Sequence, residues 1–310
     1  MVRILNHRNF VFMSAVLLGL FFPGAAQWTK TLMIPALALV MTLATINVPH
    51  RYFLNPRPIL KPSLIGILMT YGILSAVILI LSSGLMKDEN LRLGFVLIAA
   101  APPAVAVIPF AAMLEGDVSD ALSGTVASYL AALLLMPLIF GLWIKTHFDD
   151  PGKLVFIMLM LIVLPLLLSR GILLSVWEKR LAPVRGLLTD WSFFVVLYSM
   201  IGINSDLIFS RPLNLLPMAA VAFCSTFLLG GLIRAAGRLF KMNREKTVSL
   251  VLLGTLKNQG LAGGLAVALF EKEAALPSAI YSVFMILYII WLGARGKRDL
   301  KILSLTKRCR

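Results

Sequence analysis

Long apolar segments are the feature that most constrains this chain. Ten of them follow one another, and each reaches or nearly reaches the ~20 residues that a helix needs to cross a bilayer. Inside lipid only helices and closed barrels satisfy their own amides, and uninterrupted apolar runs lack the alternation of barrel strands. The sequence therefore predicts an all-α membrane protein with ten transmembrane helices. The predicted spans are 9–25, 30–48, 60–84, 92–114, 118–145, 153–175, 189–205, 213–237, 247–270 and 276–295.

The distribution of charge predicts the orientation of these helices. The chain is 59% hydrophobic and 14% charged, which excludes an ordinary soluble class. Of its 29 Lys and Arg residues, 20 fall in connections on the side of the N-terminus and 7 on the other side. Cytoplasmic connections collect basic residues. We therefore expect an integral protein of the plasma (inner) membrane, with both termini cytoplasmic, contacts to membrane lipid and no nucleic-acid partner.

The N-terminal stretch 1–27 resembles a signal peptide, because basic residues precede its apolar run. Further spans follow at once, so we expect the first helix to be retained rather than cleaved.

The polar sequence Lys257-Asn258-Gln259 lies near the middle of the apolar segment that runs from about Thr247 to Phe270. Ten residues separate Lys257 from the start of that segment, which is about 15 Å of helix and so the depth of a bilayer midplane. A lysine at that depth costs ~2.5–3.5 kcal/mol on insertion scales. Such a side chain normally faces a cavity or a partner, so Lys257 is the leading functional candidate.

A pair of prolines predicts a break in another apolar segment. Pro102 and Pro103 have no amide hydrogen, so the carbonyls of Ile98 and Ala99 lose their helical donors, and Ala101 is pushed toward an extended conformation. Pro109 is expected to free one more carbonyl, that of Val105. The half-helix after the break would direct its positive end at the midplane, which favours an anionic ligand.

The two halves of the chain look like versions of one another. A basic turn precedes each candidate break: Lys87 lies 15 residues before Pro102, and Lys241 lies 16 residues before Lys257. Because five helices is an odd number, a tandem duplication inverts the second copy, and inverted repeats are typical of secondary transporters. We expect one transmembrane transporter domain over 1–310, with the first five-helix repeat at 1–146 and the second at 147–310.

Two stretches resemble the bile acid–sodium symporter family: Ala100-Ala-Pro-Pro-Ala-Val-Ala-Val-Ile-Pro-Phe-Ala-Ala-Met-Leu-Glu-Gly-Asp117 and Gly254-Thr-Leu-Lys-Asn-Gln-Gly-Leu-Ala262. The layout of ten apolar segments agrees over nearly the whole chain. The resemblance implies a panel domain and a core domain whose fourth and ninth helices are discontinuous and cross. It also implies the transport of organic anions by alternating access.

The chain departs from the family at the sodium-site motifs. The family's Pro-Gly-Gly motif becomes Pro102-Pro103-Ala104 here, and the Ser-Asn pair after it becomes Val107-Ile108. The family's ninth-helix glutamate falls on Leu253 and its glutamine on Lys257. Matching residues remain at the following positions: Asn258, Gly260 and Thr125, with the family's third-helix glutamine falling near Thr70. This is the pattern of a divergent member with degenerate sodium sites.

The acidic residues agree with the loss of sodium coupling. All fourteen are predicted to lie in connections or near helix ends, whereas hard cations prefer oxygen ligands that include carboxylates. We expect the ammonium of Lys257 to occupy a former cation site. Lys257 could release and regain a proton during transport, or stay charged and pair with a substrate carboxylate. A lysine that only hydrogen-bonds free carbonyls at the helix crossing is the structural alternative.

The remaining candidates follow from the same reasoning. The substrate-binding residues are predicted to be Lys257, Asn258, Gln259, Pro103, Ala104 and Thr125, and the coupling residues Lys257 and Thr70. Asn258 and Gln259 could instead join helices by hydrogen bonds alone. We expect Arg170 to lie at the interface, at the end of a helix that stops near Ser169. No motif for enzyme catalysis, a cofactor or a metal ion is present.

The sequence therefore predicts a secondary active transporter of small organic anions, not an enzyme, with no metal or cofactor and with a proton or sodium as the coupling ion. One alternative is a sodium-coupled symporter of the same family whose cation site uses backbone carbonyls with Thr70, Thr125 and Gln259. Another is a transport-inactive membrane scaffold or sensor.

Overall fold

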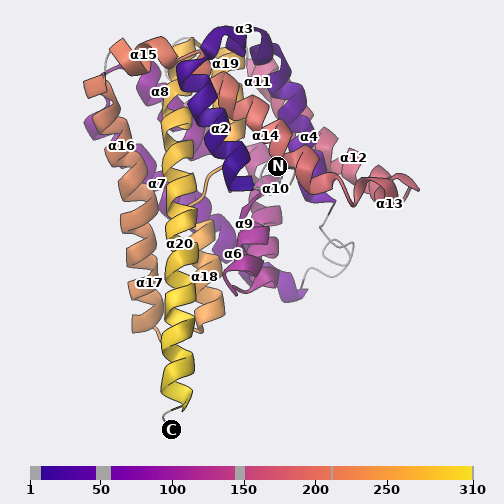
Figure 1. Ribbon diagram of the computed structural model, residues 1–310, viewed down its shortest axis with the longest axis vertical. Helices are drawn as coiled ribbons and strands as arrows, with labels where there is room; N and C mark the ends of the chain where they lie inside the picture. Colours follow the sequence, from indigo (N-terminus) through magenta and orange to yellow (C-terminus); the bar gives the residue numbers. More distant parts are fainter. Residues whose placement is uncertain (1–7, 47–56, 144–150, 211, 309–310) are drawn as a thin grey trace.

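The computed structural model describes residues 8–46, 57–143, 151–210 and 212–308, and they form helices throughout, joined by short connections (Figure 1). The first part of the chain forms α2 (Arg8–Phe21), α3 (Ala26–Thr29), α4 (Met33–Thr45), α6 (Arg57–Ile67), α7 (Ser75–Leu85), α8 (Glu89–Ala100), α9 (Val107–Met113) and α10 (Val118–Trp143). The second part forms α11 (Pro151–Met158), α12 (Leu164–Leu173), α13 (Trp177–Leu181), α14 (Arg185–Gly202), α15 (Ser205–Ser210), α16 (Leu215–Phe223), α17 (Leu229–Leu239), α18 (Arg244–Leu253), α19 (Gln259–Leu269) and α20 (Leu276–Arg308).

Some neighbouring helices form one continuous rod through a short segment of different pitch. Wider π-helical turns join α6 to α7, α11 to α12 and α16 to α17, while tighter 3₁₀ turns flank α3, α16 and α20. The π segments are Leu68–Leu74, Leu159–Val163 and Cys224–Leu228. The 3₁₀ segments are Pro23–Ala25, Lys30–Leu32, Pro212–Asn214 and Lys272–Ala275. π segments often mark functional sites in helices.

Five helical rods in the described residues are long and apolar enough to cross a membrane. They are Pro23–Thr45, Ile59–Leu85, Val118–Trp143, Leu215–Leu239 and Lys272–Arg295. Three apolar helices are shorter: Phe10–Phe21, Leu159–Leu173 and Gln259–Leu269. By length and composition the fold thus provides five spans, and the full set of ten stays a prediction.

Both interruptions expected from the sequence are present. The backbone leaves the helix between the end of α8 at Ala100 and the start of α9 at Val107. It leaves the helix again between the end of α18 at Leu253 and the start of α19 at Gln259. In each case two half-helices replace one rod.

The helices pack in two groups that meet along one boundary (Figure 1). In the first group, α14 packs against α2 and α4, and α12 packs against α4. The second group contains the interrupted helices: α10 packs against α6, α8 and α18, while α20 packs against α16, α8 and α19. Across the boundary, α14 contacts α19 and α20. Much of α8 is completely buried, so the interrupted helices lie at the centre of the second group.

The two interrupted helices, α8–α9 and α18–α19, run antiparallel, as the contacts at their outer ends show. The turn after α9 is joined to the start of α18, because Glu115 accepts from the Arg244 guanidinium at 3.1 Å and the Asp117 amide donates to the Glu245 carbonyl at 3.0 Å. At the opposite end, α8 packs against the 3₁₀ turn that follows α19.

Several helix ends differ from those predicted. The helix expected at 189–205 begins four residues earlier, at Arg185, which places Asp190 in its second turn. The helix expected to stop near Ser169 continues to Leu173, so Arg170 lies in its last turn and donates to the Thr45 carbonyl at the end of α4. In the first case the helix begins before its apolar segment does, and in the second it continues past Ser169 and Arg170, in agreement with the predicted span 153–175.

The crossing of α6 and α10 depends on two glycines that face each other. A methyl group added at Gly66 would meet the backbone of Gly124, which cannot move aside without shifting the helix. Gly66→Ala should therefore lower the free energy of unfolding by ~1–3 kcal/mol, the usual range for overpacking. Gly141→Ala is the matched control, since open space surrounds Gly141. Thermal unfolding in detergent measures both; equal melting temperatures would contradict the tight crossing.

Candidate functional site

The two interruptions pair with each other through their backbones. The Ala104 amide donates to the Leu256 carbonyl at 3.0 Å, and the Asn258 amide donates to the Pro102 carbonyl at 2.9 Å. Pro103 and Lys257 therefore form an isolated antiparallel bridge. Non-helical backbone at membrane depth must find partners within the protein, and here each interruption supplies them to the other.

The carbonyls next to the prolines are only partly as expected. Ala101 is extended, with φ −63° and ψ 147°, as predicted for a residue before proline. The Ile98 carbonyl loses the α-helical donor that residue 102 would supply, but the Ala101 amide, which also bonds Leu97, reaches it instead at 3.3 Å. Pro109 is the third residue of α9, where an amide hydrogen has no partner within the helix, so it does not break that helix.

Lys257 is completely buried, and its ammonium group is held by three oxygens. The ammonium nitrogen donates to Ser75 Oγ at 3.0 Å, to the Ala99 carbonyl at 2.8 Å and to the Ala101 carbonyl at 2.7 Å. It also lies 4.4 Å from the centroid of the Tyr71 ring, where the face of the ring attracts a cation. All three ammonium hydrogens are thus used. An ammonium among converging oxygens occupies the kind of position that a small metal cation takes.

The three oxygens around the Lys257 ammonium form a cage. The rod formed by α6 and α7 orients this cage through its π segment. The Thr70 hydroxyl donates to the Leu253 carbonyl at 3.1 Å, at the point where α18 ends. Ser75 Oγ lies 2.9 Å from the Thr70 carbonyl and 2.7 Å from the Ala99 carbonyl. Thr70 therefore holds a carbonyl next to the second interruption, that of Leu253, and Ser75 holds one next to the first, that of Ala99. Ser75 also accepts from Lys257.

Asn258 connects the crossing to α10 and begins α19. Its side-chain nitrogen donates to the Tyr129 hydroxyl at 2.9 Å, and its side-chain oxygen accepts from the Leu261 amide at 3.0 Å. The second bond is an N-cap, which satisfies one of the free amides at the start of a helix. Asn258 is thus a structural residue as well as a wall of the cavity described next.

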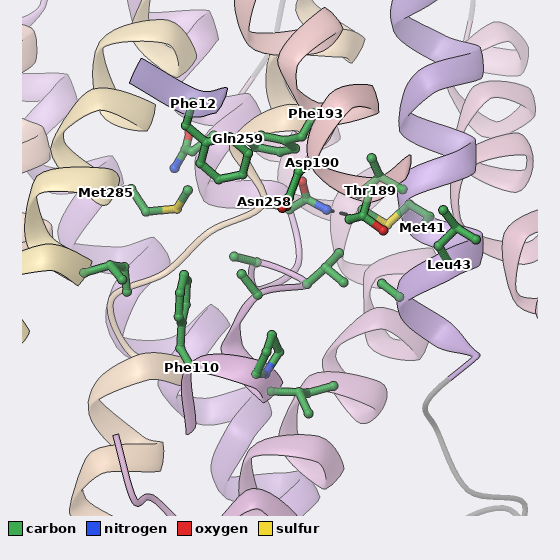
Figure 2. Close-up of a pocket in the computed structure, with 18 of the residues that line it drawn as sticks. Phe12, Met41, Leu43, Phe110, Thr189, Asp190, Phe193, Asn258, Gln259 and Met285 are labelled. Carbon is green, nitrogen blue, oxygen red and sulfur yellow. Dashed lines mark hydrogen bonds between the residues drawn. The ribbon is translucent and has the colours of Figure 1, made fainter. Parts of the chain in front are cut away.

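A cavity of about 320 Å³ lies between the two helix groups, beside the crossing (Figure 2). In Figure 2, Phe12 and Phe193 lie next to Gln259 at one end and Phe110 lies at the other, and the walls are mostly apolar. Polar residues also line it: Arg185, Thr189, Asp190, Lys257, Asn258 and Gln259. Its volume falls in the range of small-molecule sites, ~300–1,000 Å³.

Gln259 is the cavity residue whose polar atoms most need a partner. Its side chain is 1% exposed, and neither its amide nitrogen nor its amide oxygen has a hydrogen-bond partner within the described part of the chain. A buried polar group without a partner costs free energy, ~1–3 kcal/mol each. A ligand with both a donor and an acceptor would satisfy this amide.

The remaining predicted residues lie around the crossing in different roles. Ala104 lines the cavity, whereas Pro103 lies in the backbone bridge and is not among the lining residues. Thr125 borders a second cavity of about 40 Å³, and its buried hydroxyl has no partner among the described residues. Lys257 is among the residues that line the larger cavity, although the partners of its ammonium, Ser75, Ala99 and Ala101, are not.

Sequence reasoning missed several residues of this site. Ser75 and Tyr71 hold Lys257, and Tyr129 holds Asn258, but single polar residues in apolar helices gave no sign of their long-range partners. Asp190 was placed near a helix end, yet it lines the cavity. In the described residues no group of His, Cys, Asp and Glu side chains could hold a metal ion.

The Ser75 hydroxyl should contribute more to stability than an ordinary buried serine. Ser75→Ala removes an acceptor from Lys257 and a donor from the Ala99 carbonyl, so we expect a loss of ~1–3 kcal/mol in the free energy of unfolding. Ser82→Ala is the control, because the buried Ser82 hydroxyl bonds only within its own helix, to Leu79. Chemical or thermal unfolding in detergent measures the difference; equal losses would argue against the cage.

Comparison with known proteins agrees with this architecture. The chain is 24% identical over 275 residues to a protein of Bacillus subtilis named uncharacterized sodium-dependent transporter YocS, covering 86% of this chain and 83% of that protein. Residues 9–293, nearly the whole chain, match a family of bile acid/sodium symporter-like transporters. The prediction of a transporter rather than an enzyme is confirmed, and this integral membrane protein belongs to the SBF-like CPA transporter family.

Proposed function

We propose that this protein is a secondary transporter of small organic anions that does not need sodium, because the ammonium of Lys257 permanently fills a cation position. The observation that carries the proposal is the group of three oxygens around that ammonium. Family membership supports transport and argues against a transport-inactive scaffold or sensor.

The arrangement of the helices supports an inverted repeat. Each half of the chain has a rod with a π segment, Leu68–Leu74 in one and Cys224–Leu228 in the other, followed by an interrupted helix. The interrupted helices run antiparallel and pair at their midpoints, as expected for inverted copies. These features favour ten helices, with the first repeat at 1–146 and the second at 147–310.

The position of the cavity supports alternating access. It lies between two helix groups, so sliding of one group against the other would expose it to each side in turn. Its lining includes Leu43 and Ala44 at the end of α4, and Arg185 and Gly186 at the start of α14. These ends are cytoplasmic in the predicted orientation, with both termini inside the plasma (inner) membrane. We infer that this conformation faces the cytoplasm.

The substrate is inferred from the chemistry of the cavity. Apolar walls suit a hydrocarbon or aromatic body, while Arg185 and the N-terminal end of α19 at Gln259 favour a negative group. Asp190 adds an acceptor, so a hydroxyl or amino group on the substrate would fit beside the anionic group. Asn258 and Gln259 would orient the polar end.

Among the roles open to Lys257, that of a fixed cation has the most support. Loss of a proton would leave the nitrogen with two hydrogens for three oxygens, so the cage favours the charged form. Direct pairing with a substrate carboxylate has less support: Lys257 borders the cavity, but its ammonium is already held by Ser75 and by the carbonyls of Ala99 and Ala101, which lie outside the cavity lining. Proton-linked transport through Lys257 would require the cage to open during the cycle.

A sodium-coupled symporter is the second candidate. Its support is the printed name of the Bacillus subtilis relative, together with buried side-chain atoms that have no partner in the described residues. Thr125, Ser128 and Gln259 carry such atoms. Thr70 supports it less, because its hydroxyl already bonds Leu253. A sodium ion prefers oxygen ligands of this kind.

Replacing the ammonium should create a sodium requirement. Lys257→Gln removes the fixed charge and leaves the oxygens of Ser75, Ala99 and Ala101 beside a new amide oxygen. We expect sodium to raise the melting temperature of this variant by several degrees over potassium at equal ionic strength, because a ligand that binds the folded state stabilises it. The wild-type protein should respond equally to both salts; a sodium-specific rise in the wild type would favour the symporter.

Transport itself needs a test with a substrate found by a thermal-shift screen of carboxylates across pH and sodium. In vesicles, Lys257→Met should reduce uptake at least about tenfold, because three buried oxygens lose their partner at the crossing of the interrupted helices. Arg92→Gln, which changes an exposed basic residue, is the control. Uptake that survives in the folded Lys257→Met protein would reject the proposed role of Lys257.

A further inference from the structure

Two arginines from different helices contact the same tryptophan at one end of the second helix group. The guanidinium carbon of Arg234 on α17 lies 5.6 Å from the centroid of the Trp291 ring, and that of Arg295 on α20 lies 5.1 Å from it. Trp291 is half-buried among other rings, 5.8 Å from Tyr288 and 5.5 Å from Phe227. The Trp291 ring is thus in contact with one guanidinium group from each of the two helices.

We propose that this cluster of Arg234, Arg295 and Trp291 binds the phosphate headgroup of an anionic membrane lipid. Both arginines lie in the last part of a membrane-length helical rod: Arg234 is five residues before the end of Leu215–Leu239, and Arg295 is the last residue of Lys272–Arg295. Guanidinium groups present several N–H donors, and a phosphate with several oxygens can accept paired hydrogen bonds from them.

The surroundings favour a lipid over a soluble phosphate. Leu232 and Leu239 on α17 and Phe240 directly after it are 66%, 77% and 73% exposed, which provides apolar surface for acyl chains near the headgroup. Tryptophan is enriched at the membrane–water interface. Arg238 follows Arg234 by one helical turn, and α20 continues to Arg308 with further basic residues in its sequence, so anionic lipid is attracted to this end.

The cluster is also close to the second interruption. Gly230 leaves room for the Tyr288 hydroxyl, and a methyl group there would approach Thr255 to 3.3 Å. Thr255 belongs to the non-helical segment that contains Lys257. A headgroup bound to Trp291 and its arginines would brace α17 against α20 beside this segment.

The test compares lipids on the purified protein in neutral detergent. Phosphatidylglycerol should raise the melting temperature by a few degrees relative to phosphatidylcholine, and should stay bound in native mass spectra, whereas inorganic phosphate at matched ionic strength should do neither. Arg234→Gln combined with Arg295→Gln should abolish the difference. The exposed Arg295→Gln alone should reduce it, which keeps the test usable if the double variant does not fold.

The control is Arg92→Gln combined with Lys272→Gln, which removes two exposed basic residues from the opposite end of the helix group. It should keep the full response to phosphatidylglycerol. The proposal fails if both lipids stabilise the protein equally, if inorganic phosphate reproduces the effect, or if the control loses as much of the response as the arginine variants.

Discussion

The structure depends on how two interrupted helices satisfy each other's backbone at the centre of an apolar bundle. Two amide–carbonyl bonds join the strand-like segments around Pro103 and Lys257. The Lys257 ammonium donates to the carbonyls of Ala99 and Ala101, which take no part in those two bonds. Without these partners each free group would cost several kcal/mol in a medium without water. Among the described residues, the partners of the Lys257 side chain are therefore backbone and hydroxyl dipoles and not a carboxylate.

Function follows from the same arrangement. The crossing produces a helix start at Gln259 and a short extended wall at Ala104, and both face the boundary between the helix groups, where the cavity lies. The amide of Gln259 is held there without a partner among the described residues. Buried polar atoms without a partner call for an explanation, and under the proposed function the transported substrate supplies it.

The sequence predicted the parts of this site that have a local cause. Adjacent prolines predict a break, and a lysine deep in an apolar segment predicts a buried partner. It could not predict Ser75 or Tyr71 as that partner, because most faces of the third apolar segment are apolar and periodicity therefore carries little information. The π segment after Ile67 adds to this difficulty, since it changes which side chains share a face. Asp190 was missed for another reason: its helix begins a turn earlier than its apolar pattern.

The bridge between the interruptions also determines which parts of the chain can move relative to one another. Because α8, α9, α18 and α19 are joined at their midpoints and at their outer ends, they are held together as one unit. Under the proposed alternating access, the two interrupted helices would therefore move as a pair, and the displacement would take place at the boundary with α2, α4, α12 and α14.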